Sequence, residues 1–157
     1  MELLGSLRKL FEYDYCANQE ALRSVATLNV SAQRALKVAG HIIGAQRVWL
    51  GRLEAPDAAA PAPWPLLSLE EAKAAVSEMR QRWSSFLDNL APERLDEDLV
   101  HRNSKGAELR VPVRDVLMHL VMHSAYHRGQ IAAAVREAGG TPAATDYIVH
   151  VRQHRKA

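Results

Sequence analysis

The sequence predicts a single all-α domain: a four-helix bundle with a long crossover between its second and third helices and a short C-terminal helix. Four long segments carry apolar residues at helical spacing, little of the chain alternates as a strand would, and no internal repeat is present. The 157 residues, taken as one domain over 1–157, can bury a stable core without disulfides. A helix-turn-helix domain is disfavoured because no short basic recognition helix stands out among these long segments.

The first two helices are expected at about 3–28 and 31–54. In both segments apolar residues recur at three- and four-residue steps, the period of a helix with one buried face. Ser31 offers a hydroxyl as the N-cap of the second helix. Residues 55–65 contain four prolines, which remove backbone donors and disfavour helix in the residues before them. This stretch is therefore predicted to be a crossover loop and not a domain boundary.

The third helix is expected to begin at a capping box, in which the Ser68 hydroxyl and the Glu71 carboxylate satisfy free amides of the first turn. Its apolar period continues until Pro92. From 91 to 112 the helical pattern breaks, and residues 103–106 lie between two short apolar runs. A turn or a short hairpin is the interpretation there.

The fourth helix is expected from Val113 to Ala138. Gly139 and Gly140 end it, because glycine readily takes the left-handed conformation that caps a helix C-terminus. A short tail helix is expected after Asp146.

Composition argues against several functional classes. With 20 Lys and Arg against 18 Asp and Glu, no strong field favours nucleic acid, and the basic tail 152–156 is too short to supply one. Charges interrupt every apolar run before the roughly 18 residues that span a bilayer. The single cysteine, Cys16, cannot form an internal disulfide, and the first residues lack a secretory pattern. We therefore expect a cytoplasmic protein without nucleic-acid or membrane partners.

The fourth helix carries three histidines at intervals of four, His119, His123 and His127. Residues one turn apart project from the same side, and this side also carries the apolar Val116 and Leu120. The three imidazoles are therefore expected to face the bundle. Buried imidazoles without partners are costly, and their proximity lowers their affinity for protons, which leaves neutral nitrogens suited to a borderline metal ion.

The third ligand is expected from another helix. Neighbours four residues apart can share one ion, but the outer two histidines of the file are about 12 Å apart along the helix axis. His41 is the candidate, since it lies in an apolar stretch of the second helix. Gly40 and Gly44 would let a neighbouring helix approach it. By itself His41 would be a core histidine bonded to a carbonyl; the file on the fourth helix favours a metal ligand instead. His119 is equally compatible with a pocket wall that orients a ligand.

The sequence gives weaker evidence for a role of the remaining histidines. His150 and His154 share the spacing of four but lie in a short tail beside basic residues, which indicates a solvated face with adventitious metal affinity. Nothing around His101 suggests a role.

The segment from His123 to Gln130, with Tyr-His-Arg-Gly-Gln at its end, closely resembles the signature of the DinB/YfiT-like metalloprotein superfamily, and most closely its DinB branch. Further blocks along nearly the whole chain are similar to that family: Leu10-Phe11-Glu12-Tyr13, Ala17-Asn18, Gly40-His41-Ile42 with Trp49, and Pro142-Ala143-Ala144-Thr145-Asp146.

The resemblance implies an up-down-down-up bundle, often dimeric, with a divalent ion held by one histidine of the second helix and two of the fourth. These positions match His41, His123 and His127. Zinc or nickel is the expected ion, although tris-imidazole sites also accept copper or iron. The understood relatives are thiol transferases that activate a low-molecular-weight thiol; others are isomerases or hydrolase-like proteins.

One position departs from the family. Members commonly carry an aromatic residue, often Trp, where this chain has Cys16. We expect Cys16 to be a small buried side chain or, if it faces the pocket, to change the pocket's shape. Arg128 is expected to be a solvated charge or a clamp for an anion or a carboxylate. Gln130 and Asp146 are candidates to orient a ligand or water, and Gly129 to permit close helix packing.

Two functions remain open. The leading hypothesis is a metal-dependent transferase in which a small thiol, or water, attacks a small electrophile at an open position on the ion. The rival is a non-enzymatic stress-response protein that binds a metal or small ligand. No general base is evident, and the absence of a His-Glu-x-x-His pattern argues against a metalloprotease.

Overall fold

The computed structural model describes residues 2–103 and 105–154. Within them the chain forms five α-helices, one 3-10 turn and a two-stranded sheet. In chain order these are α1 (Glu2–Ala26), α2 (Gln33–Glu54), α3 (Leu69–Asp88), η1 (Pro92–Asp96), β1 (Asp98–Arg102), β2 (Glu108–Pro112), α4 (Val113–Glu137) and α5 (Tyr147–His154). The predicted fold class, a helical bundle with a short C-terminal helix, is confirmed.

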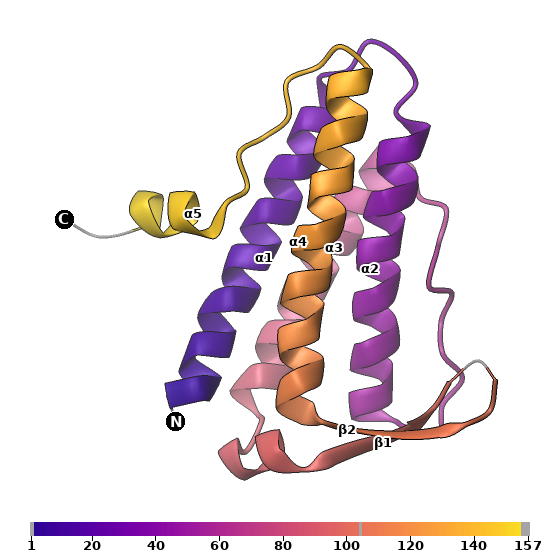
Figure 1. The fold of residues 1–157 in the computed structure, drawn as a ribbon, viewed down its shortest axis with the longest axis vertical. Coiled ribbons are helices and arrows are strands. Elements are labelled where there is room, and N and C mark those ends of the chain that lie inside the picture. The colour runs from indigo at the N-terminus through magenta and orange to yellow at the C-terminus, as the bar shows by residue number, and fades with distance from the viewer. Residues whose placement is uncertain (1, 104, 155–157) are drawn as a thin grey trace.

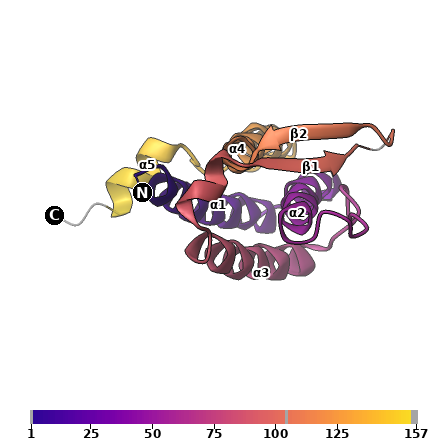
Figure 2. The ribbon, with the colours of Figure 1, turned by 90° about the horizontal axis from the view of Figure 1, so that it is seen from below.

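The four long helices run up, down, down and up (Figure 1). α1 packs mainly against α3 and α4, and α2 packs mainly against the same two helices. Figure 2, seen along the bundle, shows the four helices in cross-section, with the hairpin lying across the end where α2 finishes and α4 begins. The long crossover after α2 is what allows α2 and α3 to run parallel.

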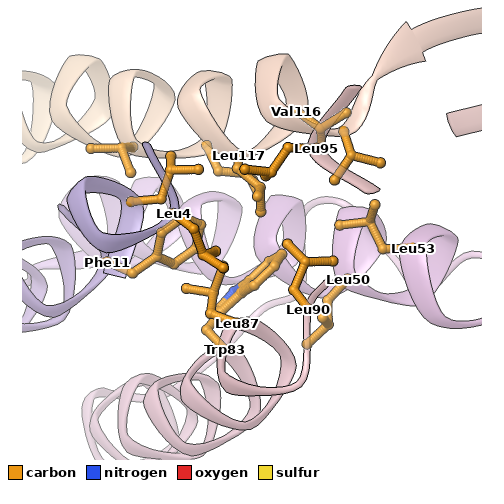
Figure 3. Packing of buried hydrophobic residues seen from close by; sticks show 14 of the residues in the cluster. Leu4, Phe11, Leu50, Leu53, Trp83, Leu87, Leu90, Leu95, Val116 and Leu117 are labelled. Atoms are coloured by element: carbon orange, nitrogen blue, oxygen red, sulfur yellow. The ribbon is translucent and has the colours of Figure 1, made fainter. Parts of the chain in front are cut away.

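The core has two parts. In the half nearest the hairpin, large side chains from all four helices meet, among them Phe11, Trp83 and Leu117 (Figure 3). The rings of Phe11 and Trp83 are 4.8 Å apart between centroids. The other half is built from smaller residues, mostly Ala, Val and Ile, of the same helices. Burial of this apolar surface is the main source of stability for such a bundle.

The predicted start of α3 and the predicted end of α4 agree with the structure. The predicted capping box of α3 is confirmed, because Ser68 Oγ accepts from the Glu71 amide at 3.2 Å and Glu71 Oε2 accepts from the Ser68 amide at 2.7 Å. Gly139 ends α4 with a φ of 80°, as expected. The prediction for Ser31 is wrong: α2 begins two residues later, with Ala32 at the N-cap position and no side-chain bond there.

α3 ends at Asp88, earlier than the sequence indicated. Pro92 explains the difference, since it forces Ala91 into an extended conformation (ψ 133°) and then begins the 3-10 turn η1. Asn89 closes the helix through hydrogen bonds of its amide and side chain to the Ser85 carbonyl.

The suggested hairpin is confirmed as an antiparallel pair in which Leu99 lies opposite Val111. Asn103 Oδ1 accepts from two amides of the turn, and Gly106 has a φ of 79°. Ser104, part of the predicted turn, lies outside the described residues, as do 155 and 156 of the basic tail.

None of the described helices has the length and apolarity that crossing a bilayer requires.

The crossover lies directly on α2, and two glycines make this possible. A Cβ on Gly44 would be 2.7 Å from the Pro63 carbonyl carbon, and one on Gly40 would clash with the Pro65 carbonyl oxygen. Both glycines therefore admit the backbone of the crossover. The expectation that they admit a neighbouring helix is wrong.

Candidate metal centre

Three histidines from two helices meet between α2 and α4. His41, His123 and His127 each place a ring nitrogen within 4.8 Å of the other two. The Nε2 atoms of His41 and His123 are 3.0 Å apart. Ligand nitrogens on one tetrahedral ion are roughly 3.4 Å apart, given metal–nitrogen bonds of about 2.1 Å. The described group could therefore hold one divalent ion with only small side-chain rotations.

Outer hydrogen bonds fix the ring tautomers of two of these histidines. His41 Nδ1 is 2.9 Å from the Pro63 carbonyl oxygen, and His127 Nδ1 is 2.8 Å from Gln130 Oε1. A carbonyl oxygen only accepts, so each Nδ1 carries the proton and each Nε2 keeps a free lone pair. His123 Nδ1 is buried and has no hydrogen-bond partner among the described residues. The tautomer of His41 and His127, with the proton on Nδ1 and Nε2 free, is the one that metal-binding histidines usually have.

The environment favours the neutral form of two of these imidazoles, those of His123 and His41. Burial, followed by the neighbouring His127, His41 and His119, lowers the pKa of His123 to about 4. Burial also lowers the pKa of His41, although its bond to Pro63 acts in the opposite direction. Neutral imidazoles are the form that binds a metal.

A pH dependence follows for the metal-free chain. Between the ordinary pKa of 6.5 and the lowered value of about 4, the unfolded chain protonates His123 while the folded chain does not. Unfolding then takes up protons, so stability falls as pH falls through this window. We expect a loss of about 1–2 kcal/mol, because the half-exposed ring is partly screened by solvent.

Urea unfolding of chelator-treated protein at pH 7 and pH 4.5 measures this effect. His123→Gln should lose less stability on acidification than wild type, whereas His119→Gln, a variant of an exposed histidine in the same helix, should behave like wild type. Equal losses in all three proteins would contradict the assignment.

Trp64 covers the His41 ring and was not anticipated. The two rings are stacked, with centroids 3.7 Å apart and planes inclined by 8°. Trp64 belongs to the crossover and remains 46% exposed. The signal in the sequence was an aromatic residue among prolines, but only the prolines entered the prediction. The crossover thus contributes both a stacking ring and the Pro63 carbonyl to the centre.

Gly44→Ala is expected to weaken metal binding about tenfold, the scale for disturbing an outer partner of a ligand. The new methyl group pushes the crossover away from α2 and with it the Pro63 carbonyl that orients His41. Gly51→Ala is the matched control, because a Cβ there meets nothing within 4 Å. Zinc titration by calorimetry distinguishes the two, and unchanged affinity in Gly44→Ala would show that the crossover does not support the centre.

His119 is exposed and lies outside this group, although it was expected to face inward. Its ring centroid is 5.4 Å from that of His123 and 6.1 Å from that of Trp49. The reason is helical geometry: four residues exceed one turn by about 40°, so a file of three histidines rotates steadily around the helix. His127 is 9% exposed, His123 is half-buried, and His119 faces solvent.

Arg128 is not a solvated charge, which was one of its two expected roles. Of the anions considered in the other role, the one it holds is a carboxylate of the chain itself, Asp14. Arg128 is 2% exposed, and its Nη1 donates to Asp14 Oδ1 at 2.5 Å and to Asn18 Oδ1 at 2.9 Å. The other carboxylate oxygen of Asp14 accepts from Asn18 and from Gln46. Burial raises the pKa of Asp14, and the Arg128 guanidinium opposes that rise.

This buried network joins α1, α2 and α4 through Asp14, Gln46 and Arg128. Sequence reasoning missed Asp14, because a carboxylate on an otherwise apolar helix face gives no indication of its partner on a distant helix.

The other residues proposed to orient a ligand or to shape the pocket lie in two different places. Gln130 lies at the metal centre, where it accepts from His127. Cys16 and Asp146 instead line a cavity of about 140 Å³ between α1 and α5. Gly129 has open space where a Cβ would be, so the expectation that it permits close packing is wrong. His101 is buried on β1 against the Trp49 ring, with centroids 5.0 Å apart.

The fold and the site together define a class of protein: an up-down-down-up helical bundle with three converging histidines, a candidate metal centre, between its second and fourth long helices. Comparison with known families makes this specific: residues 18–156 match the model of the DinB family, and the chain belongs to that family.

Two relatives illustrate the likeness. Protein DinB of Bacillus subtilis (strain 168) is 32% identical over 83 residues, which are 53% of this chain and 47% of that protein. The match therefore spans about half the length of that relative. The crystal structure of a DinB-like protein from Bacillus cereus ATCC 10987 superposes with a TM-score of 0.61 and 18% identity, covering 82% of this chain and 89% of that one. At this identity the structural likeness supports the fold alone.

Proposed function

We propose that this chain is a metal-dependent transferase in which a low-molecular-weight thiol, or water, attacks a small electrophile at the centre formed by His41, His123 and His127. One observation carries the proposal: three imidazoles from two helices converge, and two of them have their Nδ1 protons held by carbonyl oxygens. Zinc or nickel suits this donor set.

His41, His123 and His127 would hold the ion, which would act as a Lewis acid and make a thiol or water lose its proton more readily. The chain's own groups hold the ligands in place for this. The Pro63 carbonyl and Gln130 orient two rings, and Trp64 shields the face of His41 from water. An arrangement that is fixed before substrate binds lowers the reorganisation needed for reaction.

Exposed side chains of α4 border the centre. Tyr126 is 68% exposed and its ring centroid is 5.1 Å from that of His127. His119 is exposed as well and lies beyond His123. We propose that His119 receives the proton of the incoming thiol, as a positioned imidazole commonly does in acid–base catalysis.

The test begins with metal analysis of untagged protein purified without a metal resin. Thiol transfer is then assayed with several low-molecular-weight thiols and a fluorogenic bimane as electrophile. Every protein in this test also carries Cys16→Ala, so that no ion is held by that thiolate. The parent protein should hold one ion and turn over. His123→Ala should lose both properties, and His150→Ala should keep them. His119→Ala should keep the ion but lose about 100-fold in rate, the usual scale for a general base.

The rival function is an outcome of the same experiment. Protein that holds an ion on the three histidines but turns over no thiol and hydrolyses no electrophile would be a metal-binding protein without catalysis. Protein in which His123→Ala keeps its ion would contradict both functions.

A further inference from the structure

A second group of metal-ligating side chains lies on the other side of the bundle, where α5 rests beside α1 (Figure 1). Cys16 of α1 and His150 and His154 of α5 place one sulfur and two ring nitrogens all within 4.8 Å of one another. In the sequence these residues are more than 130 positions apart, and the tail pair by itself indicated only a solvated face. Because α5 lies beside α1, His150 and His154 are close to the Cys16 thiol.

The two histidines are arranged as a helical pair that can share an ion. Their rings are stacked with centroids 4.1 Å apart. His154 Nδ1 is 2.9 Å from the His150 carbonyl oxygen, so it carries the proton and leaves Nε2 free. His150 is half-buried, with its ring edge against Tyr13 at 5.6 Å between centroids. Burial and the neighbouring His154 lower the pKa of His150, which favours its neutral form.

The surroundings favour a cation. The side chains share a cavity of about 140 Å³ with the carboxylates of Glu20 and Asp146. Cys16 is half-buried, and burial raises the pKa of its thiol, so without an ion the sulfur keeps its proton and is a poor nucleophile. The chain has no second cysteine with which it could form a disulfide.

α5 is only lightly attached to the bundle. All of α5 is described, and none of its residues is buried. Its contacts with α1 centre on Tyr13, whose hydroxyl donates to the Thr145 carbonyl at 2.7 Å and whose ring meets Tyr147 at 5.1 Å. An eight-residue helix held this lightly is expected to open locally at low free-energy cost.

We propose that Cys16, His150 and His154 form a second metal site, which binds Zn²⁺ through one thiolate and two imidazoles and fastens α5 to α1. On binding, the Cys16 thiol forms a sulfur–zinc bond and releases its proton to solvent. The mixed donor set is softer than the three imidazoles of the first centre and suits zinc or copper better than harder ions. The first centre joins two long helices and is preorganised; the second must order α5, so it binds zinc more weakly.

The single cysteine makes the test direct, because a thiol reagent reports on this site alone. Reduced, metal-free protein of residues 1–157 is labelled with Ellman's reagent with and without two equivalents of zinc. Zinc should slow the labelling of wild-type Cys16 by about tenfold or more, since a metal-bound thiolate is shielded from attack. Cobalt in place of zinc should give a thiolate-to-metal charge-transfer absorption.

Variants separate this site from the first centre. Protection should persist in His123→Ala, which removes a ligand of the first centre, and in Gln153→Ala, an exposed neighbour on α5. It should be lost in the double variant His150→Ala/His154→Ala, whose exposed or half-exposed side chains are not needed for folding. Zinc without effect on wild-type labelling, or equal protection in the double variant, would overturn the second site. Loss of protection in His123→Ala would show that zinc acts only through the first centre, which also overturns it.

Discussion

His127→Ala is expected to lower the affinity of the chain for zinc by more than about a hundredfold, the upper end of what loss of an outer partner costs. The variant removes a direct ligand that is nearly buried and held by Gln130. The two remaining histidines cannot complete a site with the same geometry. The deleted ring also leaves space that water can enter, which weakens the remaining bonds further.

Zinc competition against a chromophoric chelator measures this loss in the Cys16→Ala background, where the second site is absent. His119→Ala is the matched control: it removes an exposed histidine from the same helix and should retain wild-type affinity. An affinity in His127→Ala within a few-fold of the control would mean that the ion is held elsewhere.

Asp14→Ala is expected to destabilise the metal-free protein by about 3–5 kcal/mol, the cost of leaving one partner of a buried ion pair uncompensated. Arg128 would remain buried without its carboxylate, and Asn18 and Gln46 would each lose a hydrogen-bond partner. Replacing both charges with apolar residues, as in Asp14→Leu/Arg128→Met, should cost much less, because no buried charge is left unpaired.

Urea unfolding of chelator-treated proteins measures this difference. Glu12→Ala is the control on the same helix: it breaks an ion pair with Arg80 whose side chains are 45% and 49% exposed, and it should cost less than about 1 kcal/mol. If Asp14→Ala and Glu12→Ala destabilise equally, the buried network does not fasten the three helices.

Local rules account for the parts of the structure that the sequence predicted well. The helices followed from the spacing of apolar residues, the capping box from Ser68 and Glu71, and the end of α4 from Gly139. The group of His41, His123 and His127 was also anticipated, because two histidines one turn apart on an apolar helix face need a partner from a facing helix. The need for such a partner follows from helix geometry and the cost of burying imidazoles. The choice of His123 and His127 over His119 came from the resemblance to the DinB family.

The parts that the sequence did not predict depend on how distant segments dock. Arg128 is buried only because Asp14 of α1 meets it across the bundle. Trp64 reaches His41 only because Gly40 and Gly44 let the crossover lie on α2. Cys16 meets His150 only because α5 folds back beside α1. In each case the chemistry of one residue is set by a partner more than 20 positions away, which no local pattern encodes.

The most direct test of the metal centre is X-ray absorption at the zinc edge of Cys16→Ala protein loaded with one equivalent of zinc. Three imidazole nitrogens at about 2.0–2.1 Å are predicted, with one fewer and a weaker affinity after the further change His41→Ala. A spectrum that is identical with and without His41 would contradict a centre shared between α2 and α4.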